Sequence, residues 1–450
     1  MAKLSDELRS CLPESGPIRE YVEWAAPLSH APPTMHLASI VPLAGYELCR
    51  RGLTLGRLGP PRVWFGIVAS SSVGKTSTLG EARKFSEAFY AERFSRENSA
   101  PKPWVSLEGS LPGVIHAIAQ LTDERGRTAG ILYHNEFSKV VRLDDVVEPL
   151  NEIYDGRDYS RNLRYLQKAT ENGQQNGMQA QIKSPAFSAV VTTTPRAFER
   201  VIKPEILEGG LFVRFLWLHE RLLASDLQPQ QLDDPAGWAQ VLHSWDNWFG
   251  TLEAMRLHNL LPTIRIAEDA NGWMDHVFFE VMRERIARED VESGLALRAP
   301  AQTRHLAAIY AASRGSFACD VGDSRPFVYV TLSDVMSAAN LVMRCLGKGA
   351  ALGVQLGLES MRLSEKHTRV LAAVQEAGLL GLTRGEVFRL FSSNLDKNQI
   401  DSLIATLVDA SEIHEEVVMT PGQRGRPPKV IYSTQAWRIL EAQRAKTNSN

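Results

Sequence analysis

Short apolar runs alternate with amphipathic stretches between residues 58 and 222. Runs rich in β-branched and aromatic residues predict strands at 62–69, 104–108, 130–133, 187–193 and 211–218. Apolar residues at helical spacing predict helices at 76–93, 111–121 and 146–154. Strands that alternate with helices in this way build a parallel sheet covered on both faces, so we predict an α/β fold for this region.

The rest of the chain is patterned mainly as helices. Residues 1–57 carry apolar positions at helical spacing, interrupted at Pro27 and at the pair Pro32 and Pro33. Residues 221–355 predict helices at 269–289 and 301–312, with a loop near 313–332. We therefore predict an N-terminal helical segment (1–57), an α/β core (58–222), a helical lid (223–358), a small C-terminal domain (359–440) and a tail (441–450).

Composition excludes several classes of protein. The chain has 50 Lys+Arg and 52 Asp+Glu, so its average charge argues neither for nor against nucleic acid, which needs only a local basic face. The four cysteines are scattered without a C-x-x-C, which excludes a disulfide framework and a cysteine zinc site. No 18-residue apolar run and no apolar leader occur, so we expect a cytoplasmic protein that does not enter a membrane.

A small-residue loop joins the first predicted strand to the first predicted helix of the α/β core. It fits the spacing [A/G]-x-x-x-x-G-K-[S/T] from Ala69 to Thr76. Backbone N–H groups at such a helix start form an anion nest, the lysine reaches the phosphates, and the threonine hydroxyl ligates Mg²⁺. The predicted ATP and Mg²⁺ site comprises Ser70, Ser71, Ser72, Val73, Gly74, Lys75, Thr76 and Ser77. The alternative is a serine-rich turn without a ligand.

Polar residues end two further strands of the predicted sheet. Glu136 stands where the carboxyl end of a strand would meet the phosphates, so it is the candidate general base. Asn135 beside it has no charge, and its carbonyl would hold a Mg²⁺-bound water. Thr193 ends a strand expected between those of Lys75 and Glu136, where it would hold the attacking water or the γ-phosphate. The alternatives are a solvated strand end and a threonine that merely favours strand structure.

Arg214 interrupts an apolar strand after Gly209 and Gly210. A buried arginine is costly without a partner. In a ring of subunits it would reach the γ-phosphate bound by the neighbour. The alternative is an ion pair within the chain, with Glu208 or Glu220.

The C-terminal region predicts helices at 364–374, 382–391 and 396–410, the second with Thr383 as N-cap, and strands at 413–419 and 429–433 around a basic tip. This order resembles a winged-helix domain. The resemblance implies that the start of the third helix contacts DNA through Lys397, Asn398 and Gln399. It also implies contacts from the wing, through Arg424, Arg426 and Lys429. A winged helix that binds protein is the alternative.

Taken in order, these blocks resemble additional-strand P-loop ATPases of the AAA+ type. Gly109-Ser110, Asn135-Glu136-Phe137, the T-T-P at 193–195 and the G-G-x-x-x-R-F at 209–215 also look like minichromosome-maintenance-type helicases and the P-loop family of phage, plasmid and island replication modules, close to primase-helicases. The resemblance covers about half of the chain. It implies a P-loop sheet and a helical lid whose sensor-2 arginine is Arg298 or Arg304. It also implies basic pore loops, which would use Arg157, Arg161, Arg164 and Lys168.

The leading hypothesis is an ATP-driven DNA motor, a ring-forming and hexameric replicative helicase of a mobile element that works with other replication proteins. The second is an ATP-gated DNA-binding switch, such as a helicase loader, initiator or regulator, that does not unwind DNA. The neutral Asn135 favours the second. A third, a small-molecule P-loop kinase, would be a monomer without affinity for DNA.

Overall fold

A computed structural model describes most of the chain. The described residues are 5–94, 101–123, 126–140, 146–162, 179–199, 210–220, 233–257, 263–286, 291–319, 326–361, 365–391, 400–401, 404–405, 407–408, 413–417 and 429–447. The chain divides into two compact units, Met1–Val354 and Gln355–Asn450.

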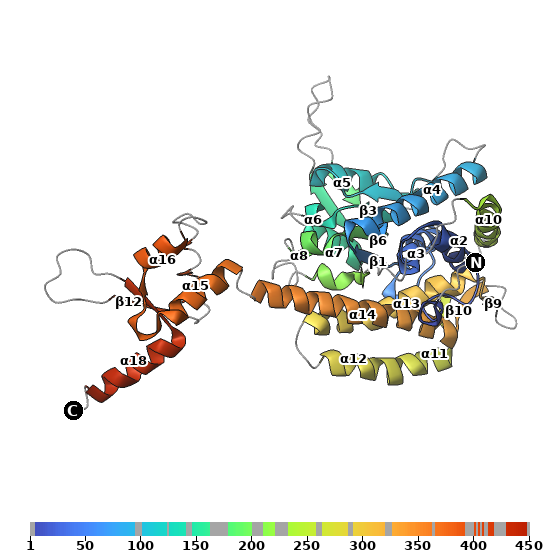
Figure 1. The fold of residues 1–450 in the computed structure, drawn as a ribbon. Coiled ribbons are helices and arrows are strands. Elements are labelled where there is room, and N and C mark those ends of the chain that lie inside the picture. Colours follow the sequence, from blue (N-terminus) through green and yellow to red (C-terminus); the bar gives the residue numbers. More distant parts are fainter. Residues whose placement is uncertain are drawn as a thin grey trace, which may run out of the picture. The chain divides into compact units, whose positions relative to one another are not determined.

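Five parallel strands form the centre of the first unit, as predicted (Figure 1). Their order is β2 (Trp104–Ser106), β3 (Thr128–His134), β6 (Pro185–Thr193), β1 (Trp64–Val68) and β7 (Leu216–His219). The strand β6 pairs with β1 on one side and with β3 on the other, which confirms the expected position of the strand that ends at Thr193. The carboxyl ends of β1, β3 and β6 therefore meet at one edge of the sheet.

The apolar runs of the sequence are explained by burial on both faces of this sheet. All residues of β1 and β6 are buried. Gly66 of β1 lies opposite Trp217 of β7, and a Cβ on Gly66 would come within 2.2 Å of the indole ring. A glycine is therefore needed there to admit the large side chain of the neighbouring strand.

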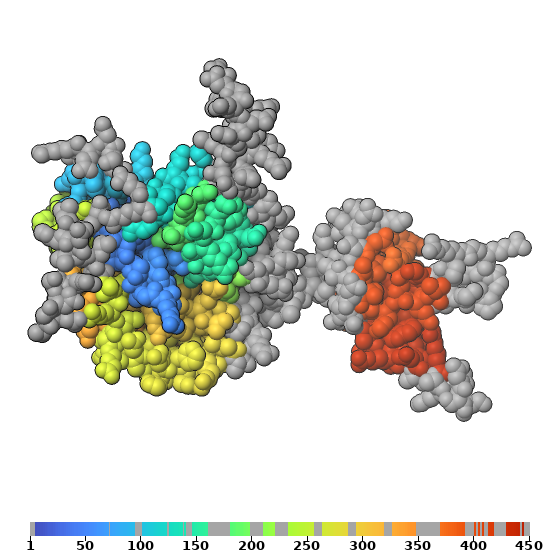
Figure 2. All heavy atoms as spheres, turned by 180° about the vertical axis from the view of Figure 1, so that it is seen from behind, coloured from blue at the N-terminus to red at the C-terminus, as the bar shows by residue number. Residues whose placement is uncertain are grey.

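Helices surround the sheet. They include α4 (Lys75–Arg93), α5 (Leu111–Ala119), α6 (Phe137–Val140), α7 (Val147–Asp155) and α8 (Pro195–Glu199). From the N-terminal segment, α2 (Pro17–Ala25) packs on α3 (Pro33–Arg50), and α3 contacts β1, β3 and β6. Every residue of α3 from Thr34 to Cys49 is buried, so this helix belongs to the core that supports the sheet. Figure 2 shows the same mixing on the surface, where N-terminal residues in blue adjoin later segments in green and yellow.

The region predicted as mostly helical also contains a small sheet, and the loop predicted near 313–332 is wrong in part. Its strands are β8 (Thr263–Ile266), β10 (Pro326–Val330) and β9 (Phe317–Cys319), in that order. Two of them fall in the stretch 313–332 that the Pro, Gly and Ser content assigned to a loop. β10 pairs in parallel with β8, about sixty residues earlier, and such a distant pairing leaves no local pattern.

The described part of this region contains three long helices and two short ones. They are α10 (Pro235–Leu257), α11 (Glu268–Trp273), a π-helical turn (Met274–Phe278), α12 (Phe279–Ile286), α13 (Val291–Ser313) and α14 (Leu332–Met361). α12 lies alongside α13 (Figure 1). The remaining elements of the first unit are α1 (Asp6–Arg9) and short turns of 3-10 helix at Ala26–Leu28, Gly56–Leu58 and Ser71–Val73. Within the described residues, no helix has the length and apolar character needed to span a bilayer.

Two further expectations need correction. The strand predicted at 211–218 begins only at Leu216, because Phe212–Arg214 forms a 3-10 turn. This turn is stabilised by the indole of Trp217, which donates to the carbonyl of Phe212 at 2.9 Å. Next to the proposed basic loop, β4 (Tyr159–Asn162) and β5 (Gln179–Ile182) form an antiparallel ribbon, although no strand was predicted in either range.

The second unit combines helices with a three-stranded antiparallel sheet. Its elements are α15 (Glu365–Glu376), a 3-10 turn (Gly378–Leu380), β11 (Leu382–Thr383), α16 (Arg384–Phe391), β12 (Ile413–Val417), β13 (Lys429–Ser433) and α18 (Thr434–Thr447), with strand order β11-β13-β12. Thr383 caps α16 as predicted, because its hydroxyl accepts from the amide of Glu386 at 3.2 Å and the Glu386 carboxylate accepts from the Thr383 amide at 2.7 Å. A core that includes Val370, Phe391 and Ile404 joins helices and sheet.

Candidate functional site

The loop between β1 and α4 makes a tight turn immediately before the helix begins. Ser71–Val73 makes one 3-10 turn, and Gly74 then adopts φ +83°, which glycine tolerates without strain. α4 begins directly at Lys75 and runs for 19 residues, so its first amide groups point towards the loop. Thr76 and Ser77 are exposed at this helix start.

The ammonium group of Lys75 is held inside the loop. Its Nζ atom donates to the carbonyl of Ser70 at 3.4 Å, a long contact, and the residue is only 5% exposed. Burial lowers the pKa of Lys75, and the negative charge of Glu136 opposes that shift. The loop therefore holds a buried cation with weak compensation, and a phosphate bound there would supply the missing negative charge.

Glu136 is fixed by neighbours on two strands. The hydroxyl of Thr193 donates to Glu136 Oε1 at 3.1 Å, and the amide of Glu136 donates to Nδ1 of His134 at 2.8 Å. Nδ1 can accept only when it carries no proton, and burial lowers the pKa of His134, which favours that neutral form. Thr192 in turn donates to the carbonyl of Asn135 at 2.7 Å. The carboxylate is therefore directed to the edge where Lys75 lies.

The donors available for Mg²⁺ are few. Thr76 and Asn135 are both exposed at the carboxyl edge, and Glu136 is the nearby carboxylate. Among the described residues, no cluster of three or more His, Cys, Asp or Glu side chains has the geometry of a metal site. This donor set fits Mg²⁺ only as a partner of bound phosphate, because that ion keeps several waters and takes few protein ligands.

The segment that leads into α3 lies against the loop, a feature that the sequence pattern did not reveal. A Cβ on Gly74 would lie 3.2 Å from the Cβ of Ala31. Thr34 donates to Glu220 at 2.9 Å, and the amide of Glu220 donates to the carbonyl of Val68, where β1 ends. Arg344 of α14 also reaches Glu220, at 3.3 Å. Segments far apart in the chain thus meet beside the loop.

Arg214 lies at the opposite edge of the sheet. It precedes β7, whose Leu216 is level with Phe65 near the start of β1. A five-residue strand spans about 16 Å, so the Arg214 side chain is separated by roughly that length from the loop that follows β1. Arg214 pairs within the chain, as the alternative expected, but its partner is Asp155, at 2.7 Å. Glu220 lies elsewhere, and Glu208 is outside the described residues.

The two arginines proposed in the helical region lie in different surroundings. Arg298 is 3.8 Å from Asp155 and so lies beside Arg214, at the edge away from Lys75. Arg304 pairs with Asp275 at 2.8 Å. Of the proposed basic pore residues, Arg157 pairs with Glu152 at the surface. Arg161 belongs to β4, and Arg164 and Lys168 lie outside the described residues.

Most predicted DNA contacts of the second unit fall outside the described residues: Lys397, Asn398, Gln399, Arg424 and Arg426. Lys429 is described, and its Nζ atom lies 2.8 Å from Glu415. Arg384 pairs with the same carboxylate and with Asp401. Lys429 on the sheet and Arg384 at the start of α16 are therefore both paired with acidic neighbours.

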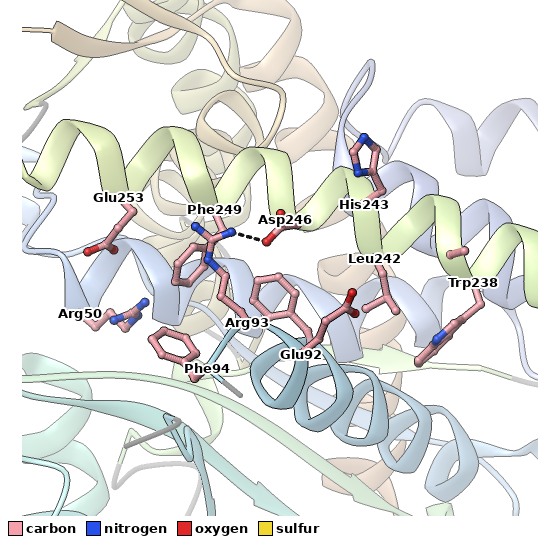
Figure 3. Close-up of a pocket in the computed structure, with 12 residues that line it drawn as sticks. Arg50, Glu92, Arg93, Phe94, Trp238, Leu242, His243, Asp246, Phe249 and Glu253 are labelled. Atoms are coloured by element: carbon pink, nitrogen blue, oxygen red, sulfur yellow. Dashed lines mark hydrogen bonds and ion pairs between the residues drawn. The ribbon is translucent and has the colours of Figure 1, made fainter. Parts of the chain in front are cut away.

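A pocket of about 960 Å³ lies at the other end of α4 (Figure 3). Phe94 follows that helix, while α10 contributes Trp238 and Phe249. Arg93 stacks over the ring of Phe249 and pairs with Asp246. A 19-residue helix is about 28 Å long, so this pocket is distinct from the loop at Lys75. Its lining includes two arginines (Arg50 and Arg93) and three carboxylates (Glu92, Asp246 and Glu253), so it offers no surplus of positive charge to a phosphate.

Comparison of the chain with protein-family models and with curated proteins gave no match.

Proposed function

We propose that the protein is an ATP-dependent DNA motor that binds ATP and Mg²⁺ at the loop from Ser70 to Ser77. The observation that carries this proposal is that Lys75, Glu136 and Thr193 lie at one edge of the sheet. Lys75 follows β1 through the loop, Glu136 follows β3, and Thr193 ends β6, which pairs with both of these strands. A buried cation, a directed carboxylate and a helix start together form the arrangement that phosphoryl transfer to water requires.

The roles of the side chains follow from their positions. Lys75 and the first amides of α4 hold the phosphates, and Glu136 accepts a proton from the attacking water. Thr193 and His134 keep the carboxylate of Glu136 in place. Bound ATP with Mg²⁺ supplies the phosphoanhydride bond and the charge neutralisation, with the Thr76 hydroxyl as a metal ligand and Asn135 reaching the metal through a water.

DNA binding and assembly are the less direct parts of the proposal. The helices, capped α16 and β12–β13 hairpin of the second unit support a winged-helix domain. Arg214 lies too far from the loop of its own chain to act there, which supports action on the nucleotide of a second copy in a ring. The helicase is then a hexamer in which each nucleotide lies between two chains.

The nucleotide site is tested by binding and hydrolysis with three variants. Lys75→Ala removes the buried cation and should abolish binding of a fluorescent ATP analogue. Glu136→Gln should retain binding and lose about 100-fold or more in hydrolysis, the usual effect of removing a general base. Lys84→Ala is the control, because Lys84 is exposed on the same helix. Unchanged hydrolysis in Lys75→Ala would refute the site.

A second candidate function is an ATP-gated switch that does not move along DNA. Two observations favour it: Asn135 brings no charge to the metal, and both Arg384 and Lys429 of the second unit are paired with Glu415. Strand displacement on a forked duplex separates the two. Unwinding that requires Glu136 supports the motor, and ATP-dependent binding without unwinding supports the switch.

A further inference from the structure

Three arginines from distant segments converge on one tyrosine at the amino edge of the sheet. The guanidinium carbons of Arg62, Arg214 and Arg298 lie 5.8, 5.5 and 5.5 Å from the centre of the Tyr154 ring. Asp155 pairs with Arg214 at 2.7 Å and with Arg298 at 3.8 Å. We call these three arginines the arginine cluster.

The arginine cluster carries more positive charge than its surroundings neutralise. Within the part of the chain that the structure describes, Asp155 is the one carboxylate that forms ion pairs with these arginines. Arg62 instead reaches the carbonyl of Pro185, at 3.4 Å. Burial raises the pKa of Tyr154, so its hydroxyl adds no negative charge. Three guanidinium groups beside one carboxylate leave an excess of two positive charges, which an anion would relieve.

The cluster is open to a ligand from outside the chain. The side chains of Arg298 and Asp155 are 32% and 23% exposed, while that of Arg214 lies behind them at 8%. All lie at the edge opposite Lys75, so the nucleotide of the same chain cannot reach them. Guanidinium groups bind phosphate oxygens in bidentate fashion, and a polyphosphate carries more charge than a carboxylate.

We propose that the arginine cluster is a polyphosphate site, and that Asp155 is an internal carboxylate that blocks it until the phosphates of a nucleotide on a second copy displace it. The assignment of those phosphates to a second copy rests on the proposed function. The polyphosphate site and its blockade by Asp155 do not. Asp155 thereby keeps the isolated chain from presenting Arg214, and nucleotide-dependent contact between copies releases it.

The blockade is tested with tripolyphosphate, in chains that carry Lys75→Ala so that the loop does not contribute. Adding Asp155→Asn should tighten tripolyphosphate binding about tenfold or more, because a charged competitor for the arginines is lost. Adding Arg298→Gln as well should abolish the gain. Asp275→Asn is the matched control. It removes the carboxylate partner of Arg304, which lies on α13 like Arg298 but is not part of the arginine cluster. A folded Asp155→Asn chain that binds no more tightly would overturn the proposal.

A second measurement avoids Asp155→Asn, because that variant leaves the buried Arg214 without its carboxylate partner and is the one most prone to misfold. Arg298→Gln chains retain the loop, and Lys75→Ala chains retain the cluster. A mixture of the two should hydrolyse ATP faster than the sum of the separate chains. No gain on mixing, with active wild-type chains, contradicts a role of the cluster between copies. If wild-type chains hydrolyse no ATP, that result would contradict the proposed function. The tripolyphosphate measurement would still test the arginine cluster, because it measures binding and needs no hydrolysis.

Discussion

The buried carboxylate of Glu47 in α3 provides a sharp test of how the first unit is stabilised. Its side chain has no exposed surface, and it accepts hydrogen bonds from Arg50, Arg51 and Tyr90. Arg51 is itself 1% exposed, and it also reaches Glu253 at 3.3 Å. Although burial alone would raise the pKa of Glu47, the two arginines hold it below the ordinary value of 4.5.

Glu47→Gln keeps the shape of the side chain and removes its charge. Breaking a buried ion pair by removing one partner costs about 3–5 kcal/mol, because the remaining charge stays buried. Two arginines lose their partner here, although Arg51 retains Glu253, so we expect a loss of about 3 kcal/mol or more in the free energy of unfolding. Denaturation by guanidinium chloride at pH 7 measures this loss.

A control variant and the pH dependence test whether the loss of the buried charge causes the destabilisation. Glu253→Gln alters the more exposed partner of Arg51 and should cost less than about 1 kcal/mol. Because Glu47 has a lowered pKa in the folded state, its contribution is complete above pH 4.5 and declines as the pH falls through the folded-state value. The difference between wild type and Glu47→Gln should therefore narrow in acid. Equal losses for the two variants at pH 7 would refute the buried-charge account.

Two further predictions concern the sheet. Thr193→Val removes the hydrogen bond to Glu136 without changing the size of the side chain. ATP hydrolysis in steady-state kinetics should fall about tenfold, while the nucleotide affinity measured by titration should stay within a few fold. An equal loss of hydrolysis and of affinity would contradict a role confined to positioning. Gly66→Ala places a methyl group within 2.2 Å of the Trp217 ring and should destabilise the unit by about 1–3 kcal/mol in thermal unfolding. Gly80→Ala in α4, which has open space around it, is the control and should be neutral or stabilising.

The central sheet could be predicted because its signals are local. Continuous apolar runs such as Trp64–Val68 arise because these strands are buried on both faces of the sheet. The loop that follows is identified by the fixed spacing of its residues from Ala69 to Thr76. The strand that ends at Thr193 was correctly expected between the other two, and the Thr383 cap depends on residues only three positions apart. These features require no knowledge of distant segments.

Other features could not be predicted because they depend on pairs far apart in the chain. The strand Pro326–Val330 pairs with Thr263–Ile266, and it lies within residues 313–332, which the sequence pattern assigned to a loop. Asp155 was not foreseen as the partner of Arg214, since 59 positions separate them. Nothing in the periodicity of α3 indicated that Ala31 would cover Gly74.

Residue types and short spacings thus determined the kind of elements, the turn before α4 and the presence of Lys75, Glu136 and Thr193 at strand ends. Only the tertiary structure decided which of the proposed residues meet: it brought Lys75 near Glu136 and separated both from Arg214 and Arg298. The physical reason is that local backbone preferences act over a few residues, whereas the edge of the sheet on which a side chain lies depends on strand order and direction, which long-range packing sets.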